Sequence, residues 1–163
     1  MMISMLSRPI RSMRTVRQAL AAILLVFSSA AMAQTSSDYA VVDDVAIYYA
    51  VLPAEMLRTY PAGSTEALMH GGVPGGKHVH HLQIALFDAK TSARITDAKV
   101  AANVAELGLG SIEKTLEPFQ VGDAVTYGGY FEFGKRQLYE IQVQVTLPDG
   151  GKVIEKTFEY KHQ

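Results

Sequence analysis

Apolar and polar residues alternate along most of the chain beyond residue 44, a two-residue period that is typical of strands with one buried face. The alternation is clearest over residues 139–145, where every second position is apolar and the positions between are polar. Other segments with strand character are residues 45–52, 79–87, 98–104, 112–116, 125–133 and 153–160. Turn-forming residues separate these roughly seven segments and no strong helical period competes, so the pattern predicts an all-β antiparallel sandwich.

The segment 79–87 is the strand on which the candidate chemistry depends. Its even-numbered positions, such as Leu82, are apolar, and we expect them to form the core face. His78 and His80 share that parity, whereas His81 belongs to the opposite face. The neighbouring residues His80 and His81 are therefore expected to point to opposite faces of the strand.

The segments between the strands carry weaker signals. Residues 59–77 contain five glycines and two prolines, a density that predicts a loop. A loop of that length in a compact domain is either functional or disordered. We expect one helical turn over residues 54–57, loose order over residues 34–44, and a strand end at Pro118.

The first 33 residues have the three parts of a secretory signal peptide. A basic stretch without acidic residues comes first, formed by Arg8, Arg11, Arg14 and Arg17. An apolar run over residues 19–27 follows, too short for the roughly 20 residues that span a bilayer. Ala31 and Ala33 then provide the small residues of a cleavage site. We expect a signal peptide over residues 1–33, one periplasmic domain over residues 34–163, and no stable membrane insertion after cleavage.

Removing the signal peptide changes the charge of the chain. Four of its 15 basic residues leave, whereas all 16 acidic residues remain, so the mature chain has a net charge of about −5. No continuous basic stretch is left, and nucleic acid is therefore not an expected partner. The chain has no cysteine, so the core must hold the fold without disulfides. That composition fits a bacterial periplasmic protein better than a disulfide-rich secreted one.

Histidines are concentrated where the glycine-rich loop meets the strand 79–87. His78 and His80 lie two positions apart, so their Cβ atoms are expected about 6–7 Å from each other on one face. Two imidazoles at that spacing can share one ion, and we expect this pair to anchor a metal site. His162, second from the C-terminus, is expected to be frayed.

The glycine-rich loop adds further candidate ligands. Met69 and His70 precede two glycines and form an adaptable arm that can close over the anchoring pair, whereas His81 is a weaker candidate. Imidazole and thioether ligands together favour copper, with zinc as the alternative metal. No acidic residue lies between Glu66 and Asp88, so hard oxygen ligation is not supported. The competing interpretation is that these histidines are solvated and bind no ion.

Five short elements in residues 81–160 are shared with a known family. They are residues 82–88, 95–100, 107–110, 128–130 and 139–143. On these elements the segment resembles the YtkA-like family of exported domains. The resemblance implies an immunoglobulin-like sandwich and a group linked to metal or respiratory-chain handling. Many relatives carry methionines where this chain has Leu107 and Leu109, so no thioether site is expected in that turn. Residues 52–55 and 69–72 resemble a further set of periplasmic proteins.

Catalysis is not expected from this sequence. It has no cysteine nucleophile, no Gly-x-Ser-x-Gly elbow, no phosphate-binding loop and no paired carboxylates beside the histidines. Two functions remain. The first is a periplasmic domain that binds or delivers a metal ion, copper before zinc. The second is a metal-free accessory domain that binds a protein partner in a cell-envelope complex.

We predict that the exported protein begins at Gln34, because the small residues at Ala31 and Ala33 define the cleavage position. The intact mass of the protein from a periplasmic extract measures this. A protein that keeps its basic N-terminal stretch, or that is found only in membranes, would contradict the prediction.

Overall fold

Eight antiparallel strands make up most of the residues that the computed structural model describes, namely 38–134, 137–148 and 151–162. The strands are β1 (Tyr39–Val42), β2 (Val45–Pro53), β3 (Val79–Asp88), β4 (Lys99–Glu106), β5 (Ser111–Val121), β6 (Ala124–Glu132), β7 (Leu138–Thr146) and β8 (Val153–Lys161). The helical elements are α2 (Ala54–Leu57), α3 (Thr65–Leu68) and the 3₁₀ turn η1 (Met69–Gly71). None of the helices in these ranges is long and apolar enough to cross a membrane. The predicted signal peptide lies outside the described residues.

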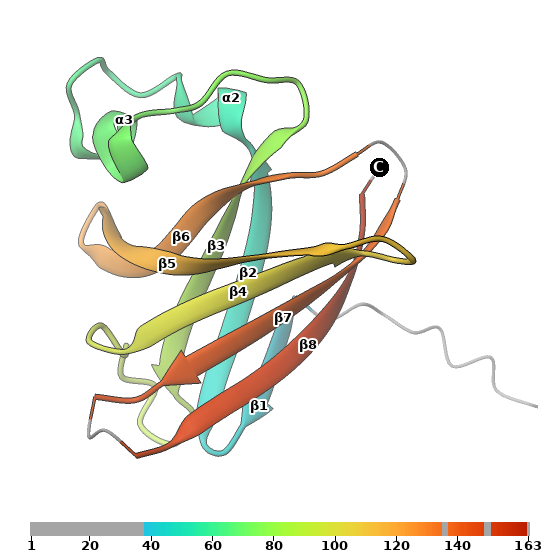
Figure 1. Cartoon of the computed structure of the whole chain (residues 1–163). Coiled ribbons are helices and arrows are strands. Elements are labelled where there is room, and N and C mark those ends of the chain that lie inside the picture. Colours follow the sequence, from blue (N-terminus) through green and yellow to red (C-terminus); the bar gives the residue numbers. More distant parts are fainter. Residues whose placement is uncertain (1–37, 135–136, 149–150, 163) are drawn as a thin grey trace, which may run out of the picture. The chain divides into compact units, whose positions relative to one another are not determined.

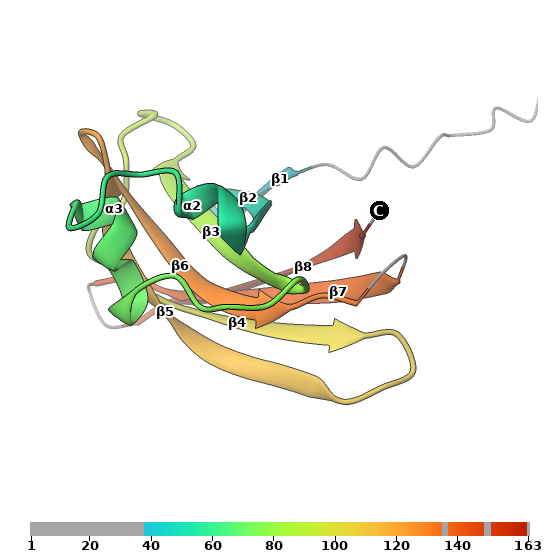
Figure 2. The same ribbon diagram turned by 90° about the horizontal axis from the view of Figure 1, so that it is seen from above.

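The strands follow the order β1-β2-β3-β6-β5-β4-β7-β8, and β5 carries the sheet from one layer of the sandwich to the other. Its first half pairs with β4, up to Leu116 opposite Val100, and its second half pairs with β6 from Glu117 onward. Figures 1 and 2 show the resulting layers, with β1, β2 and β3 in one and β4, β7 and β8 in the other. The predicted all-β, immunoglobulin-like antiparallel sandwich is thus confirmed.

Two segments depart from the expected strand pattern. The strand expected to end at Pro118 continues to Val121, because β5 has only one partner strand at any point and tolerates proline as an edge strand does. The segment expected to be loose contains β1, which pairs with β2 across a two-residue turn. Asp43 and Asp44 occupy that turn with φ of 52° and 65°, the left-handed conformations of a tight hairpin.

The core lies between the two layers and uses the face of β3 that the sequence predicted. Leu82, Ile84 and Leu86 are fully buried there and belong to the same cluster as Ile141 and other apolar residues of β7. Tyr139, at the start of β7, anchors the neighbouring turn. Its hydroxyl accepts a hydrogen bond from the amide of Gly134 at 2.5 Å and donates one to Glu106 at 3.3 Å.

Residues 54–76, which we call the cap, lie at one end of the sandwich and contain all three helical elements (Figure 1). Much of this segment was expected to be a plain loop. The helices in it are four residues or shorter, too short for a helical period to show in the sequence. Local bonds hold them: Ser64 Oγ accepts the amide of Ala67 at 3.2 Å, and Arg58 donates to the carbonyl of Pro74 at 2.7 Å.

We predict that the mature domain folds cooperatively without a metal ion, because the core strands bury their apolar faces independently of the histidines. Circular dichroism and thermal melting of chelator-treated protein measure this. Ile84→Ala, in the same metal-free protein, should cost about 2–5 kcal/mol of unfolding free energy. Loss of cooperative melting on metal removal would show that the metal is structural instead.

Candidate metal centre

His81 lies on the outer face of β3, where the cap covers it. Only 1% of its surface is exposed. The rings of Phe119 and Tyr130 pack against the imidazole, with centroids 5.0 and 5.1 Å away. Gly128 of β6 gives the ring its space, since a Cβ there would lie 2.5 Å from His81 Nε2. A polar side chain is thus held in an aromatic pocket that only a glycine on the adjacent strand allows.

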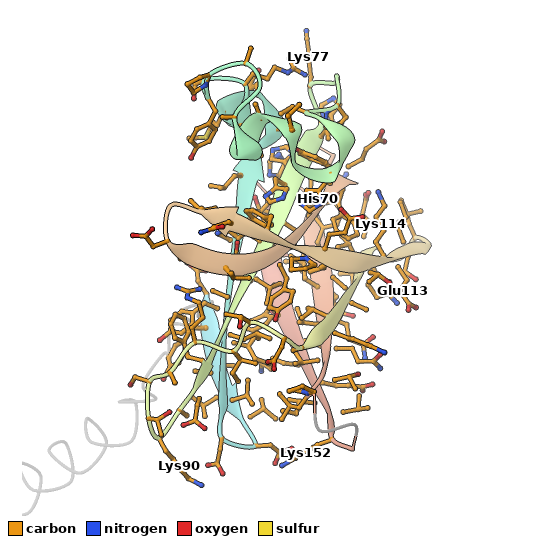
Figure 3. All side chains as sticks on the ribbon, turned by 90° about the vertical axis from the view of Figure 1, so that its left-hand side faces the viewer. His70, Lys77, Lys90, Glu113, Lys114 and Lys152 are labelled. Carbon is orange, nitrogen blue, oxygen red and sulfur yellow. The ribbon has the colours of Figure 1, made fainter. Side chains whose placement is uncertain are left out.

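The cap brings His70 to the same place. His70 has a left-handed φ of 53°, and Gly71 and Gly72 continue with φ of 79° and 100°. A left-handed non-glycine residue costs on the order of 1 kcal/mol, so packing must hold it. The reversal turns the His70 ring inward, 5.2 Å from the His81 ring. Figure 3 shows His70 beneath the helical segment and above β5 and β6.

Glu117 fixes the orientation of the His70 ring. The carboxylate oxygen of Glu117 lies 3.0 Å from His70 Nδ1. Because a carboxylate oxygen accepts, Nδ1 is the nitrogen that carries the proton, and Nε2 of the neutral ring has the free lone pair. A carboxylate that binds the remote nitrogen of an imidazole in this way is the usual outer partner of a metal-ligating histidine.

Within the described residues, three ring nitrogens of this pair have no hydrogen-bond partner. They are His70 Nε2 and both ring nitrogens of His81, and all three are buried. Leaving a buried polar atom unpaired costs roughly 1–3 kcal/mol, so such atoms are uncommon in folded proteins. A neutral imidazole keeps a proton on one nitrogen, so His70 Nε2 and one nitrogen of His81 are the two atoms that can offer lone pairs to a shared ligand.

Burial, and secondarily the neighbouring His70, lower the pKa of His81 to about 4. The imidazole therefore stays neutral at neutral pH, and the neutral imidazole is the form that binds a metal ion. Two imidazoles that share one ion at about 2.0–2.1 Å place their ring centroids from roughly 4.5 Å apart, when they lie at a right angle around the ion, to roughly 6.4 Å apart, when they lie in line. The observed 5.2 Å lies within that range. The residues present therefore fit a metal ion.

The predicted ligands do not gather at one point. His80 is buried on the core face, and its Nδ1 donates to the carbonyl of His78 at 3.0 Å, while His78 itself is exposed. The side chain of Met69 lies outside the described part of the chain. Across the described residues, no three His, Asp or Glu side chains form a ready-made metal cluster.

Two expectations from the sequence need correction. His70 does not close over His78 and His80, because its left-handed turn carries it to the outer face of β3, beside His81. His162 is not frayed. Its amide donates to the carbonyl of Gln137 at 3.0 Å, and its Nδ1 lies 3.0 Å from the hydroxyl of Tyr160.

The residues that complete the pocket were missed in the sequence. Glu117 is 47 positions from His70, and the two meet only because β5 crosses to pair with β6 beside β3. The Gly128–Gly129 pair within a strand was the one available signal, since an interior glycine marks close approach of another group.

Several solved structures share this fold. A copper-bound variant of FetP from uropathogenic Escherichia coli strain F11 is 14% identical, with a TM-score of 0.60 over 78% of this chain and 95% of that one. A DUF4426 family protein from Pseudomonas aeruginosa PAO1 is 12% identical, with a TM-score of 0.61 over 77% and 94%. Copper-reconstituted P19 from Campylobacter jejuni is 13% identical, with a TM-score of 0.57 over 78% and 94%. At such identities the likeness shows the fold alone. No family model and no curated protein sequence matches the chain, so the YtkA-like resemblance stays a prediction.

We predict that the metal-free protein loses stability as the pH falls from about 6.5 to about 4, because His81 binds a proton in the unfolded chain before it does so in the folded one. Between pH 7.5 and 4.5 this difference contributes about 2–3 kcal/mol. Urea unfolding of wild type and His81→Leu at both pH values measures it. Between the two pH values, the unfolding free energy of His81→Leu should fall by about 2–3 kcal/mol less than that of wild type. Equal falls in the two proteins would contradict the prediction.

Proposed function

We propose that this chain is a periplasmic copper-binding protein that holds its ion between His70 and His81. The observation that carries the proposal is that His70 Nε2 and the ring nitrogens of His81 are buried without hydrogen-bond partners among the described residues, on rings whose centroids lie 5.2 Å apart. The copper-bound structures that share the fold support the choice of metal. Neutral His81 supplies a fixed ligand from the strand, and His70 supplies a second ligand from the cap.

The chemistry of the pocket favours copper over other ions. Its walls include Phe119 and Tyr130, and the carboxylate of Glu117 is engaged by His70 Nδ1. Two imidazoles beside aromatic rings suit a soft ion of low coordination number, which describes Cu(I). Zinc is less well served, because its structural sites are almost always four-coordinate.

The division of the site between two elements provides a route for ion release. His81 lies on a strand with neighbours on both sides, whereas His70 lies on a cap that packs mainly through Leu57 and Val73 against Phe119. Movement of the cap would withdraw His70 and leave the ion with one protein ligand. Segments with few apolar contacts are those that open most readily. The proposed protein can therefore deliver its ion as well as bind it.

A second candidate function is a metal-free accessory domain that docks on an envelope protein. The observation that favours it is an exposed apolar area on β1 and β2, where Val41 and Tyr48 are 50% and 44% exposed. These residues line a surface pocket of about 520 Å³. That surface is separate from the His70–His81 pair, so the two functions make different predictions.

We predict that His81→Leu and His70→Ala each weaken Cu(I) binding by at least about 100-fold, since each removes one of two ligands. Glu117→Gln should weaken it by roughly 10–100-fold through the orientation of His70. Gly128→Ala, which removes no ligand but displaces the His81 ring, should also weaken it. Competition with a chromophoric Cu(I) chelator measures all four.

The matched control is His78→Ala, which alters an exposed histidine outside the pocket and should leave Cu(I) affinity unchanged. If His78→Ala and His80→Ala together abolish binding while His81→Leu does not, the pair expected from the sequence is the anchor instead. If wild type binds no tighter than about 10 μM, roughly −7 kcal/mol, the metal proposal fails and the accessory function replaces it.

A further inference from the structure

We propose a second metal site on the opposite face of β3, where His80 and His162 bind a divalent transition-metal ion, Cu²⁺ or Zn²⁺. The two rings have centroids 4.6 Å apart. Both rings pack against the ring of Phe133, with centroid distances of 5.6 Å for His80 and 6.1 Å for His162. The site shares no ligand with the His70–His81 pair and goes beyond the function proposed above.

Each imidazole of this pair is oriented through its Nδ1 atom. His80 Nδ1 donates to the carbonyl of His78 at 3.0 Å, which leaves the lone pair on Nε2. His162 Nδ1 lies 3.0 Å from the hydroxyl of Tyr160. Metal-ligating histidines are held by such bonds to a backbone carbonyl or a neighbouring polar group, and the remaining nitrogen binds the ion. In both rings Nε2 takes no part in these bonds.

The separation of the rings fits ligands at neighbouring positions around one ion. With metal–nitrogen distances of about 2.0–2.1 Å, two imidazoles about 90° apart have centroids roughly 4.5 Å from each other. The observed distance is 4.6 Å. The rings are inclined at 81°, so one of them would rotate about its Cβ–Cγ bond to bring its Nε2 to the same ion as the Nε2 of the other ring.

An open cleft lies over the pair. Its volume is about 270 Å³, and its lining residues are Val51, Pro53, His80, Tyr160, Lys161 and His162. A cleft of that size admits water, which completes the coordination of a borderline divalent ion. Burial, and then the nearby His80 and His78, lower the pKa of His162.

Backbone hydrogen bonds hold the C-terminal end of β8, including His162, in place. Lys161 pairs with Leu138 of β7, and the next amide, that of His162, donates to the carbonyl of Gln137. These backbone bonds hold His162 against β3 without help from a metal. The ion would therefore bind between two rings that already lie side by side, and only the rotation of one ring would remain to be made.

The test uses the mature chain without an affinity tag, because a histidine tag would itself bind the ions. His70→Ala and His81→Leu are first combined to remove the other site. Isothermal titration of this background with Zn²⁺ and with Cu²⁺ should give one equivalent bound, and Cu²⁺ spectra should show nitrogen ligands. Adding His162→Ala or His80→Gln should weaken binding by at least about 100-fold, and adding Tyr160→Phe by roughly 10-fold. Circular dichroism confirms that each variant is folded.

A background protein that binds neither ion tighter than about 100 μM, roughly −5.5 kcal/mol, would overturn the proposal. Binding that survives both His162→Ala and His80→Gln would overturn it as well, and would show that the rings serve only to hold the C-terminus. Neither result bears on Cu(I) binding by His70 and His81, which is measured separately in the otherwise unaltered chain.

Discussion

A neutral imidazole buried beneath the cap is the constraint on which the arrangement of this end of the molecule depends. His81 is almost fully enclosed, yet neither of its ring nitrogens has a hydrogen-bond partner within the part of the chain that the structure describes. Gly128 leaves the room that the ring occupies, Phe119 packs against it, and the left-handed turn at His70 brings a second imidazole to it. Each of these features has a local cost, and the cost is explained if the pocket holds an ion.

Side chains alternate between the two faces of β3, so neighbouring residues lie in different environments. His80 and His81 are adjacent in sequence and lie on opposite faces, one at an open cleft with His162 and the other in a closed aromatic pocket with His70. An aromatic environment favours a soft ion of low coordination number, whereas a cleft open to water favours a divalent ion with additional ligands. The two proposed sites would therefore differ in the ion that they bind, although one strand supplies a ligand to each.

The sequence predicted the strands well because each has a regular two-residue period and one buried face, as Leu82 and Ile84 show. It identified the histidine-rich stretch but grouped His70 with His78 and His80, whereas His70 lies beside His81 in the structure. The odd position of His81 on the strand placed it correctly on the outer face. An outer face is normally solvated, and it is the tertiary packing of the cap that buries this residue. The bond between His70 and Glu117 depends on the crossing of β5 from one layer to the other, which no local pattern encodes.

The most direct test of the central claim is a crystal structure of the copper-loaded protein with anomalous diffraction recorded at the copper edge. With one equivalent of Cu(I), an anomalous peak should lie beneath the cap, bonded to one nitrogen each of His70 and His81, with Glu117 still bound to His70 Nδ1. A peak elsewhere, with the nitrogens of His81 still unpaired, would contradict the assignment of this pair as the copper site.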